Sequence, residues 1–175
     1  MKLKRTRKDL IKRLNYYYPM ERMHAFITFP LIVIYLLSTN SVLNIVFLLY
    51  GLILCISILY QGQHYWKLKL NRITKKAFDQ DKNLAFFRKS KRMNLIMIAL
   101  IPLIFIVQLY LSDWKLKTDN LMFWGWMANT FGVLEHINYY ERQLMIDNLS
   151  DLDYVMRNRK LKVASLAKDL TENQI

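Results

Sequence analysis

Cysteine is nearly absent from this 175-residue chain, and its scarcity excludes several kinds of protein. The only one, Cys55, lies inside an apolar run, so the sequence has neither a disulfide framework nor a CxxC pair for metal or redox chemistry. Only four glycines and three prolines occur in a chain that is 54% hydrophobic, which excludes collagen-like and low-complexity disordered proteins. We therefore expect a single folded domain.

Sequence signatures of catalysis are missing as well. The chain contains no Gly-rich phosphate loop, GxSxG elbow, HExxH pair or kinase signature. Asp147, Asp151 and Asp153 form an acidic cluster, but it lacks the glycine and the closing glutamate of a calcium loop. These absences favour a protein that is not an enzyme.

What the sequence does contain is a series of long apolar runs. Each run is close to the 20 or so residues that an α-helix needs to cross a bilayer. We therefore predict an all-α integral membrane protein, a four-helix bundle with amphipathic cytoplasmic helices. The predicted parts are a basic amphipathic N-terminal arm (1–18), one membrane domain (19–140) with spans at about 19–37, 42–60, 94–111 and 121–140 and a basic loop at 61–93, and a helical C-terminal tail (141–175).

The prolines bear on where the first span begins and whether it is straight. Pro19 can occupy the first turn of a helix without losing a hydrogen bond, so we expect the span to begin there. Pro30 lies in the middle of the same span and removes the backbone bond that would reach Phe26, which predicts a kink.

Basic residues outnumber acidic ones by 26 to 13, and their distribution predicts the orientation in the membrane. Eight lysines and arginines precede residue 23, ten lie in the loop 61–93 and six follow residue 141, whereas the two short turns together hold two. By the positive-inside rule, both termini and the loop face the cytoplasm. The predicted location is the plasma membrane.

Aromatic and apolar residues are interleaved with the lysines and arginines of the loop 61–93. Such a mixture can bind RNA by stacking and charge, but no nucleic-acid motif accompanies it, so a pair of helices on an anionic membrane surface is the favoured interpretation. The predicted lipid-binding residues are Lys67, Lys69, Lys75, Lys76, Arg88 and Lys89.

The last apolar run, 121–140, separates two faces at helical spacing. Gly125, Ala128 and Gly132 share one face with polar residues, and small residues let membrane helices approach closely. The opposite face is apolar and is predicted to contact lipid. The predicted polar site within the membrane comprises Asn129, Glu135, His136 and Gln143. An alternative interpretation places Glu135 and His136 at the headgroup layer, where they simply reach water.

All three histidines fall towards the predicted cytoplasmic side, near several glutamates. Neutral imidazoles and carboxylates are the usual ligands of zinc and non-haem iron. A di-iron bundle needs two Glu-x-x-His pairs, and this chain has only the Glu21/His24 pair. We therefore expect no cofactor, with a zinc or iron ion as the alternative. The candidate metal ligands are Glu21, His24, His64, Glu135 and His136.

Three functional hypotheses follow. The leading one is a non-enzymatic accessory or interaction protein that engages anionic lipid and either a second copy of itself or a membrane partner. The second is a small oligomeric transporter or channel lined by Asn129, Glu135 and His136. The third is a metal-dependent membrane enzyme. A cluster in which His136 shares a proton with a carboxylate is a further alternative for the polar site.

Overall fold

The computed structural model describes residues 7–116, 121–146 and 149–175, and helices make up 81% of the chain. The all-α prediction is confirmed, since the described residues form helices joined by turns. In chain order the elements are α1 (Arg7–Met23), the π-helix η1 (His24–Thr28), α2 (Phe29–Thr39), the 3₁₀ turn η2 (Val42–Asn44), α3 (Val46–Ile73), α4 (Gln80–Leu111), α5 (Met122–Tyr140), α6 (Leu149–Asn158) and α7 (Ser165–Glu172).

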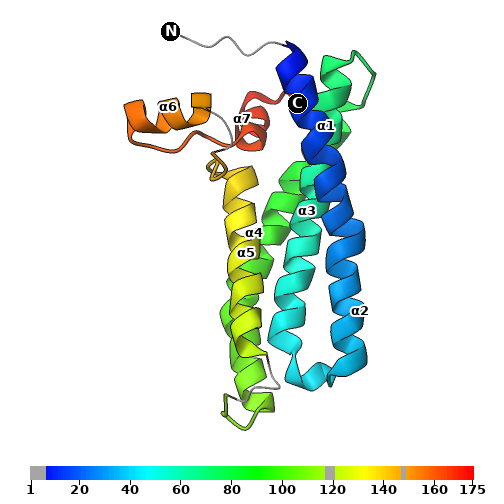
Figure 1. The fold of residues 1–175 in the computed structure, drawn as a ribbon, viewed down its shortest axis with the longest axis vertical. Helices are drawn as coiled ribbons and strands as arrows, with labels where there is room; N and C mark the ends of the chain where they lie inside the picture. The colour runs from blue at the N-terminus through cyan, green and yellow to red at the C-terminus, as the bar shows by residue number, and fades with distance from the viewer. Residues whose placement is uncertain (1–6, 117–120, 147–148) are drawn as a thin grey trace.

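The elements α1, η1 and α2 follow one another as a single long rod along one side of the molecule (Figure 1). The predicted helix start at Pro19 is wrong, because Pro19 lies inside α1. A proline inside a helix removes its own backbone donor and crowds the carbonyl four residues earlier, but α1 continues through Pro19. We predicted a kink at Pro30. Pro30 lies in the first turn of α2, directly after the π-helix η1, and the wider π-helical turn accommodates the proline there.

The apolar face of α1 packs on α3. Leu14 is only 2% exposed, and Tyr17 and Tyr18 are half-buried. The described part of the predicted N-terminal arm, residues 7–18, therefore packs against α3 as one wall of the bundle. Residues 1–6 of that arm lie outside the described residues.

Both central helices extend well beyond the predicted spans. The helix α3 has 28 residues and α4 has 32, so at 1.5 Å per residue they are about 42 Å and 48 Å long. Residues 61–73 and 80–93, predicted as a loop with surface helices, are the continuous ends of α3 and α4, and residues 74–79 connect them. No helix-breaking residue interrupts 63–73, so the helix continues past the apolar run.

The helix α5 packs on α3 through small residues that we predicted to allow a close approach between helices. A Cβ atom at Gly125 would lie 2.6 Å from the ring of Phe47, and one at Gly132 would lie 2.8 Å from a methyl group of Leu54. From the other side, a Cβ atom at Gly51 would lie 2.7 Å from the backbone nitrogen of Asn129. The two backbones thus approach closely only because glycine occupies these positions.

Figure 1 shows that the bundle has two unlike ends. The turns at 40–45 and 112–116 lie together at one end, which we call the turn end. The N-terminal part of α1, the connector between α3 and α4, and the helices α6 and α7 lie at the opposite end. We call this the basic end, because it holds most of the lysines and arginines of the described chain.

Three helical segments are long and apolar enough to cross a membrane: Leu10–Thr39, Val46–Ile73 and Gln80–Leu111. The fourth predicted span, α5, is not one of the three. The rod of α1 and α2 and the helix α4 bury little of their apolar length, whereas α3 is enclosed by the others. Large apolar side chains on the outer faces are consequently exposed, among them Leu31, Ile34, Ile96, Leu103, Ile106, Phe123, Trp124 and Met127.

Candidate functional site

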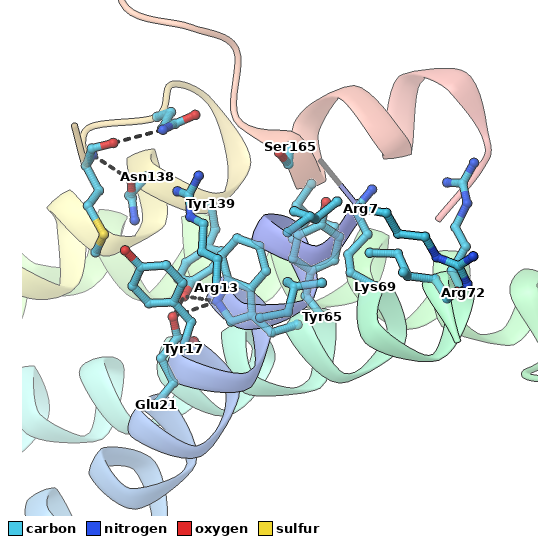
Figure 2. A pocket seen from close by; sticks show the side chains of 17 residues that line it. Arg7, Arg13, Tyr17, Glu21, Tyr65, Lys69, Arg72, Asn138, Tyr139 and Ser165 are labelled. Atoms are coloured by element: carbon cyan, nitrogen blue, oxygen red, sulfur yellow. Dashed lines mark hydrogen bonds between the residues drawn. The ribbon is translucent and has the colours of Figure 1, made fainter. Parts of the chain in front are cut away.

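A pocket of about 740 Å³ opens at the basic end between α1, α3, the C-terminal end of α5 and the start of α7 (Figure 2). Its volume falls in the range typical of small-molecule sites, roughly 300–1,000 Å³. The lining combines aromatic side chains, aliphatic side chains, four basic residues and a single acidic one. The combination of one carboxylate with several cations makes this pocket the best candidate for a site.

The acidic residue is Glu21 on α1, whose carboxyl group points towards the other lining side chains in Figure 2. It is 6% exposed. Its Oε1 atom accepts a hydrogen bond of 2.7 Å from Trp66 Nε1 on α3 and another from the hydroxyl of Tyr139 on α5. Its Oε2 atom is buried and has no hydrogen-bond partner among the described residues. The carboxyl group thus joins three helices, and its second oxygen is enclosed beside Gly62.

Gly62 on α3 makes room for this carboxyl group. A Cβ atom there would collide with Glu21 Oε2 and would lie 2.5 Å from the ring of Tyr139. Trp66 lies one helical turn later on α3 and contacts the same carboxyl group, and its ring centroid is 6.1 Å from that of Tyr139. Glycine at 62 and tryptophan at 66 therefore fix the position of the acid.

The basic residues of the lining come from α1 and α3. Arg7 donates a hydrogen bond of 2.6 Å to the carbonyl of Ile73, which ties the start of α1 to the end of α3. Arg13 lies 3.9 Å from Asp151, and Lys69 lies 2.6 Å from Asp169. Arg72 is exposed. The four basic residues and Glu21 give the lining a formal net charge of +3. Asp151 and Asp169, which lie beside the lining, reduce this local positive charge.

The helix α7 forms part of the rim because a buried aspartate holds it against α3. Asp169 is 6% exposed and accepts hydrogen bonds of 2.7 Å from Tyr65 and 2.6 Å from Lys69. Leu166, 1% exposed, lies beside them in the core. This contact brings Ser165 and Leu166 into the lining of the pocket.

A second polar cluster lies beside the pocket, in the interior between α3, α4 and α5. Gln61 and Asn94 exchange two hydrogen bonds of 3.0 Å and 2.8 Å through their amide groups. Tyr140 donates a third bond of 2.7 Å to Gln61 Oε1. All three side chains are at most 2% exposed, so the cluster joins three helices in the interior.

The four residues of the predicted polar site lie at different places. Asn129 is buried against α3, where its amide donates to the carbonyls of Phe47 (2.9 Å) and Gly125 (2.8 Å). His136 is 3% exposed and stacks on Tyr140 with ring centroids 5.1 Å apart, and neither ring nitrogen has a hydrogen-bond partner among the described residues.

The other two residues of that set lie towards the basic end. Glu135 is half-buried. Gln143 follows the end of α5 and donates a hydrogen bond of 2.9 Å to Asp151. Of the four, only Gln143 lines the pocket, and the use of the set as a transport path stays a prediction.

The candidate metal ligands do not come together. His24 lies 3.3 Å from the hydroxyl of Thr28, and His64 lies 2.7 Å from the amide of Asn83, so each histidine has a neighbour of its own. Within residues 7–116, 121–146 and 149–175, no group of three or more His, Cys, Asp or Glu side chains is placed to hold a metal ion. The predicted set Glu21, His24, His64, Glu135 and His136 is thus distributed over separate contacts.

The predicted lipid-binding residues all belong to the ends of α3 and α4 and their connector. Lys67, Lys75, Lys76 and Lys89 are exposed. Two others are engaged within the protein: Lys69 pairs with Asp169, and Arg88 bonds Asn173. The exposed lysines therefore form the outer surface of the basic end, whereas Lys69 lines the pocket.

Sequence reasoning missed most of this pocket. Glu21 was singled out, but as a metal ligand, and neither Trp66 nor Tyr139 was placed beside it. The available signal was the spacing of Leu14, Tyr17 and Glu21 on one helical face, which is apolar except at its last member. The partners on α3 and α5 are 45 and 118 residues away in the chain, and helical periodicity carries no information about such distant pairs.

Comparisons with known proteins give no further guide: no family model, no curated protein and no solved structure matches this chain. The functional conclusion therefore rests on the geometry above.

Proposed function

We propose that the protein is a small multi-pass protein of the plasma membrane that works by binding and not by catalysis. In this proposal α1 with α2, α3, α4 and α5 cross the bilayer, both termini are cytoplasmic, and the basic end contacts anionic headgroups. The protein would present this end, and the pocket within it, to lipid and to a membrane partner or a second copy.

The exposed apolar side chains support the membrane location. Water-soluble proteins rarely expose apolar patches of more than a few hundred Å². Here large apolar residues cover the outer faces of α2, α4 and α5, including Ile34 at 62%, Ile96 at 62% and Phe123 at 67% exposure. A bilayer would cover these faces, which explains why they need no protein contact.

The observation that carries the proposal is the charge difference between the two ends. Only two of the 26 lysines and arginines occur in the two short turns. The hydrocarbon core is about 30 Å thick, so the helices α3 and α4, at about 42 Å and 48 Å, are longer than it. If the turn end lies near the opposite surface, the excess length places Lys67, Lys75 and Lys89 at the headgroup layer of one leaflet.

The lipid preference can be tested with two single substitutions. Near an anionic surface each basic residue contributes about 1 kcal/mol, or about fivefold in affinity. We expect Lys76→Gln at the basic end to lower the ratio of phosphatidylglycerol to phosphatidylcholine retained by the purified protein about fivefold, as measured by mass spectrometry of the bound lipids. The matched control is Lys115→Gln at the turn end. Equal ratios for both variants and the unaltered protein would contradict the proposal.

A further inference from the structure

The helix α6 leaves the bundle at the basic end and runs across its long axis (Figure 1). Three of its apolar side chains are exposed: Leu149 at 74%, Leu152 at 43% and Met156 at 72%. We propose that this apolar side lies in the headgroup layer of the cytoplasmic leaflet, so that α6 is an in-plane helix that anchors the basic end to anionic lipid. This inference rests on the proposed function, because α6 meets lipid only if the basic end lies at the membrane surface.

The two sides of α6 have different surroundings. The three exposed apolar residues are spaced by three and four positions, so they share one side of the helix. Asp151 lies on another side and is 2% exposed. Its carboxylate accepts hydrogen bonds of 2.6 Å from Lys162 and 2.9 Å from Gln143. The polar side is therefore bound to the protein, and this contact determines which side of α6 stays uncovered.

The base of the segment that carries α6 is closed by a short antiparallel pairing. The backbone N–H of Gln143 donates to the carbonyl of Lys162 at 2.9 Å, and that of Ala164 donates to the carbonyl of Glu141 at 3.2 Å. The chain that leaves α5 thus returns beside its starting point before α7 begins. The helix α6 is consequently held next to the end of α5 and is not a free tail.

The length of α5 places α6 at the level of the headgroups. With 19 residues α5 is about 28 Å long, close to the roughly 30 Å of the hydrocarbon core. Trp124 and Trp126 near its start suit the outer aromatic belt, so its last residue, Tyr140, reaches the inner border of the core. Headgroups add roughly 5–8 Å on each side of a bilayer. The helix that follows α5 therefore begins in this layer.

Basic residues at the end of α6 complement an anionic surface. Arg159 and Lys160 follow the helix directly and are exposed. Each basic residue near such a surface contributes about fivefold in affinity. Within α6 the exposed Asp153 pairs with Arg157 at 2.7 Å, so it leaves the charge of the following pair uncompensated. An apolar side together with basic flanks is typical of helices that lie on anionic leaflets.

The size of the uncovered side favours lipid over a protein partner. Ten residues make α6 about 15 Å long, and at a width of about 10 Å its footprint is about 150 Å². A specific protein–protein interface buries about 800 Å² on each partner. The uncovered side of α6 is thus too small to hold a second copy by itself, whereas shallow insertion among headgroups needs no such area.

Spin labels can report where the two sides of α6 lie. In the full-length protein with Cys55→Ala, single cysteines replace Leu149 or Met156 on the apolar side, and Asn158→Cys, about half a turn further on from Met156, is the matched control. Leu103→Cys, at an exposed position of α4, is the reference for the bilayer. Each variant carries a nitroxide in nanodiscs of phosphatidylcholine and phosphatidylglycerol. Collisions are measured with oxygen, which concentrates in lipid, and with a water-soluble nickel chelate.

We expect the ratio of oxygen to nickel collisions to be about fivefold higher at Leu149→Cys and Met156→Cys than at Asn158→Cys, as a preference of about 1 kcal/mol for the lipid layer produces. In nanodiscs of phosphatidylcholine alone, the ratio at both apolar positions should fall. An unchanged ratio there would overturn the requirement for anionic lipid. All four labelled positions are exposed, so the labels replace no buried side chain.

The reference position separates this inference from the proposed function. A high ratio at Leu103→Cys with equal, low ratios at the three positions of α6 would overturn the in-plane helix and leave the membrane protein. A low ratio at Leu103→Cys as well would overturn the proposed function. Labels on the apolar side that are shielded from both reagents, with spin–spin broadening that disappears on dilution with unlabelled protein, would show a second copy in place of lipid.

Discussion

Replacing Asn94 by leucine should weaken the interior contact between α3, α4 and α5. Asn94→Leu removes the two amide hydrogen bonds to Gln61, each worth about 0.5–1.5 kcal/mol. Gln61 would keep its bonds with Ser57 (3.2 Å) and Tyr140 (2.7 Å), so its amide would not be left wholly unsatisfied. The expected loss in the free energy of unfolding is therefore about 1–3 kcal/mol.

The assay is reversible unfolding in mixed micelles of a mild detergent and sodium dodecyl sulfate, followed by circular dichroism. Tyr140→Phe, which removes one bond to Gln61, should cost about 0.5–1.5 kcal/mol. Tyr60→Phe, at an exposed tyrosine of the same bundle, is the control and should change stability by less than about 0.5 kcal/mol. If Asn94→Leu were no more destabilising than this control, the three-helix cluster would not contribute as described.

Two further substitutions test the space that Gly62 leaves for Glu21 and the contact that holds α7. Gly62→Val should lower the free energy of unfolding by about 1–3 kcal/mol, because the valine side chain would collide with Glu21 and Tyr139. Ala85→Val, at an exposed position of α4, is the control. Equal effects of the two substitutions in the same unfolding assay would refute the close approach at Gly62. Asp169→Asn should speed hydrogen exchange of the α7 amides, residues 165–172, about tenfold or more, since it weakens two charge-assisted hydrogen bonds worth about 1.5–3 kcal/mol each. Exchange as slow as in Glu172→Gln would show that Asp169 does not hold α7.

Local patterns in the sequence predicted one helix face well. The small residues of 121–140 were expected to pack and the aromatic ones to be exposed, and Gly125 and Gly132 do contact α3, whereas Phe123 and Trp126 are 67% and 46% exposed. This prediction succeeded because helical spacing alone decides which residues share a face. The all-α fold followed in the same way from the long apolar runs.

The extent of the helices and the composition of the pocket could not be predicted in this way. Residues 61–73 and 80–93 contain many charges, which suggested a surface loop, but charged residues continue a helix as readily as apolar ones do. Similarly, the position of Glu21 in the pocket depends on hydrogen bonds from Trp66 and Tyr139, which lie on two other helices. Tertiary packing, and not local composition, brings these three together.

The central claim is that the helices cross a membrane with the basic end in the cytoplasm. In a Cys55→Ala background, Ser41→Cys places a single thiol at the turn end and Lys75→Cys places one in the connector between α3 and α4, both at exposed positions. A membrane-impermeant maleimide applied to intact cells should label Ser41→Cys, and it should label Lys75→Cys only after the membrane is permeabilised. Labelling of Lys75→Cys in intact cells would contradict the account.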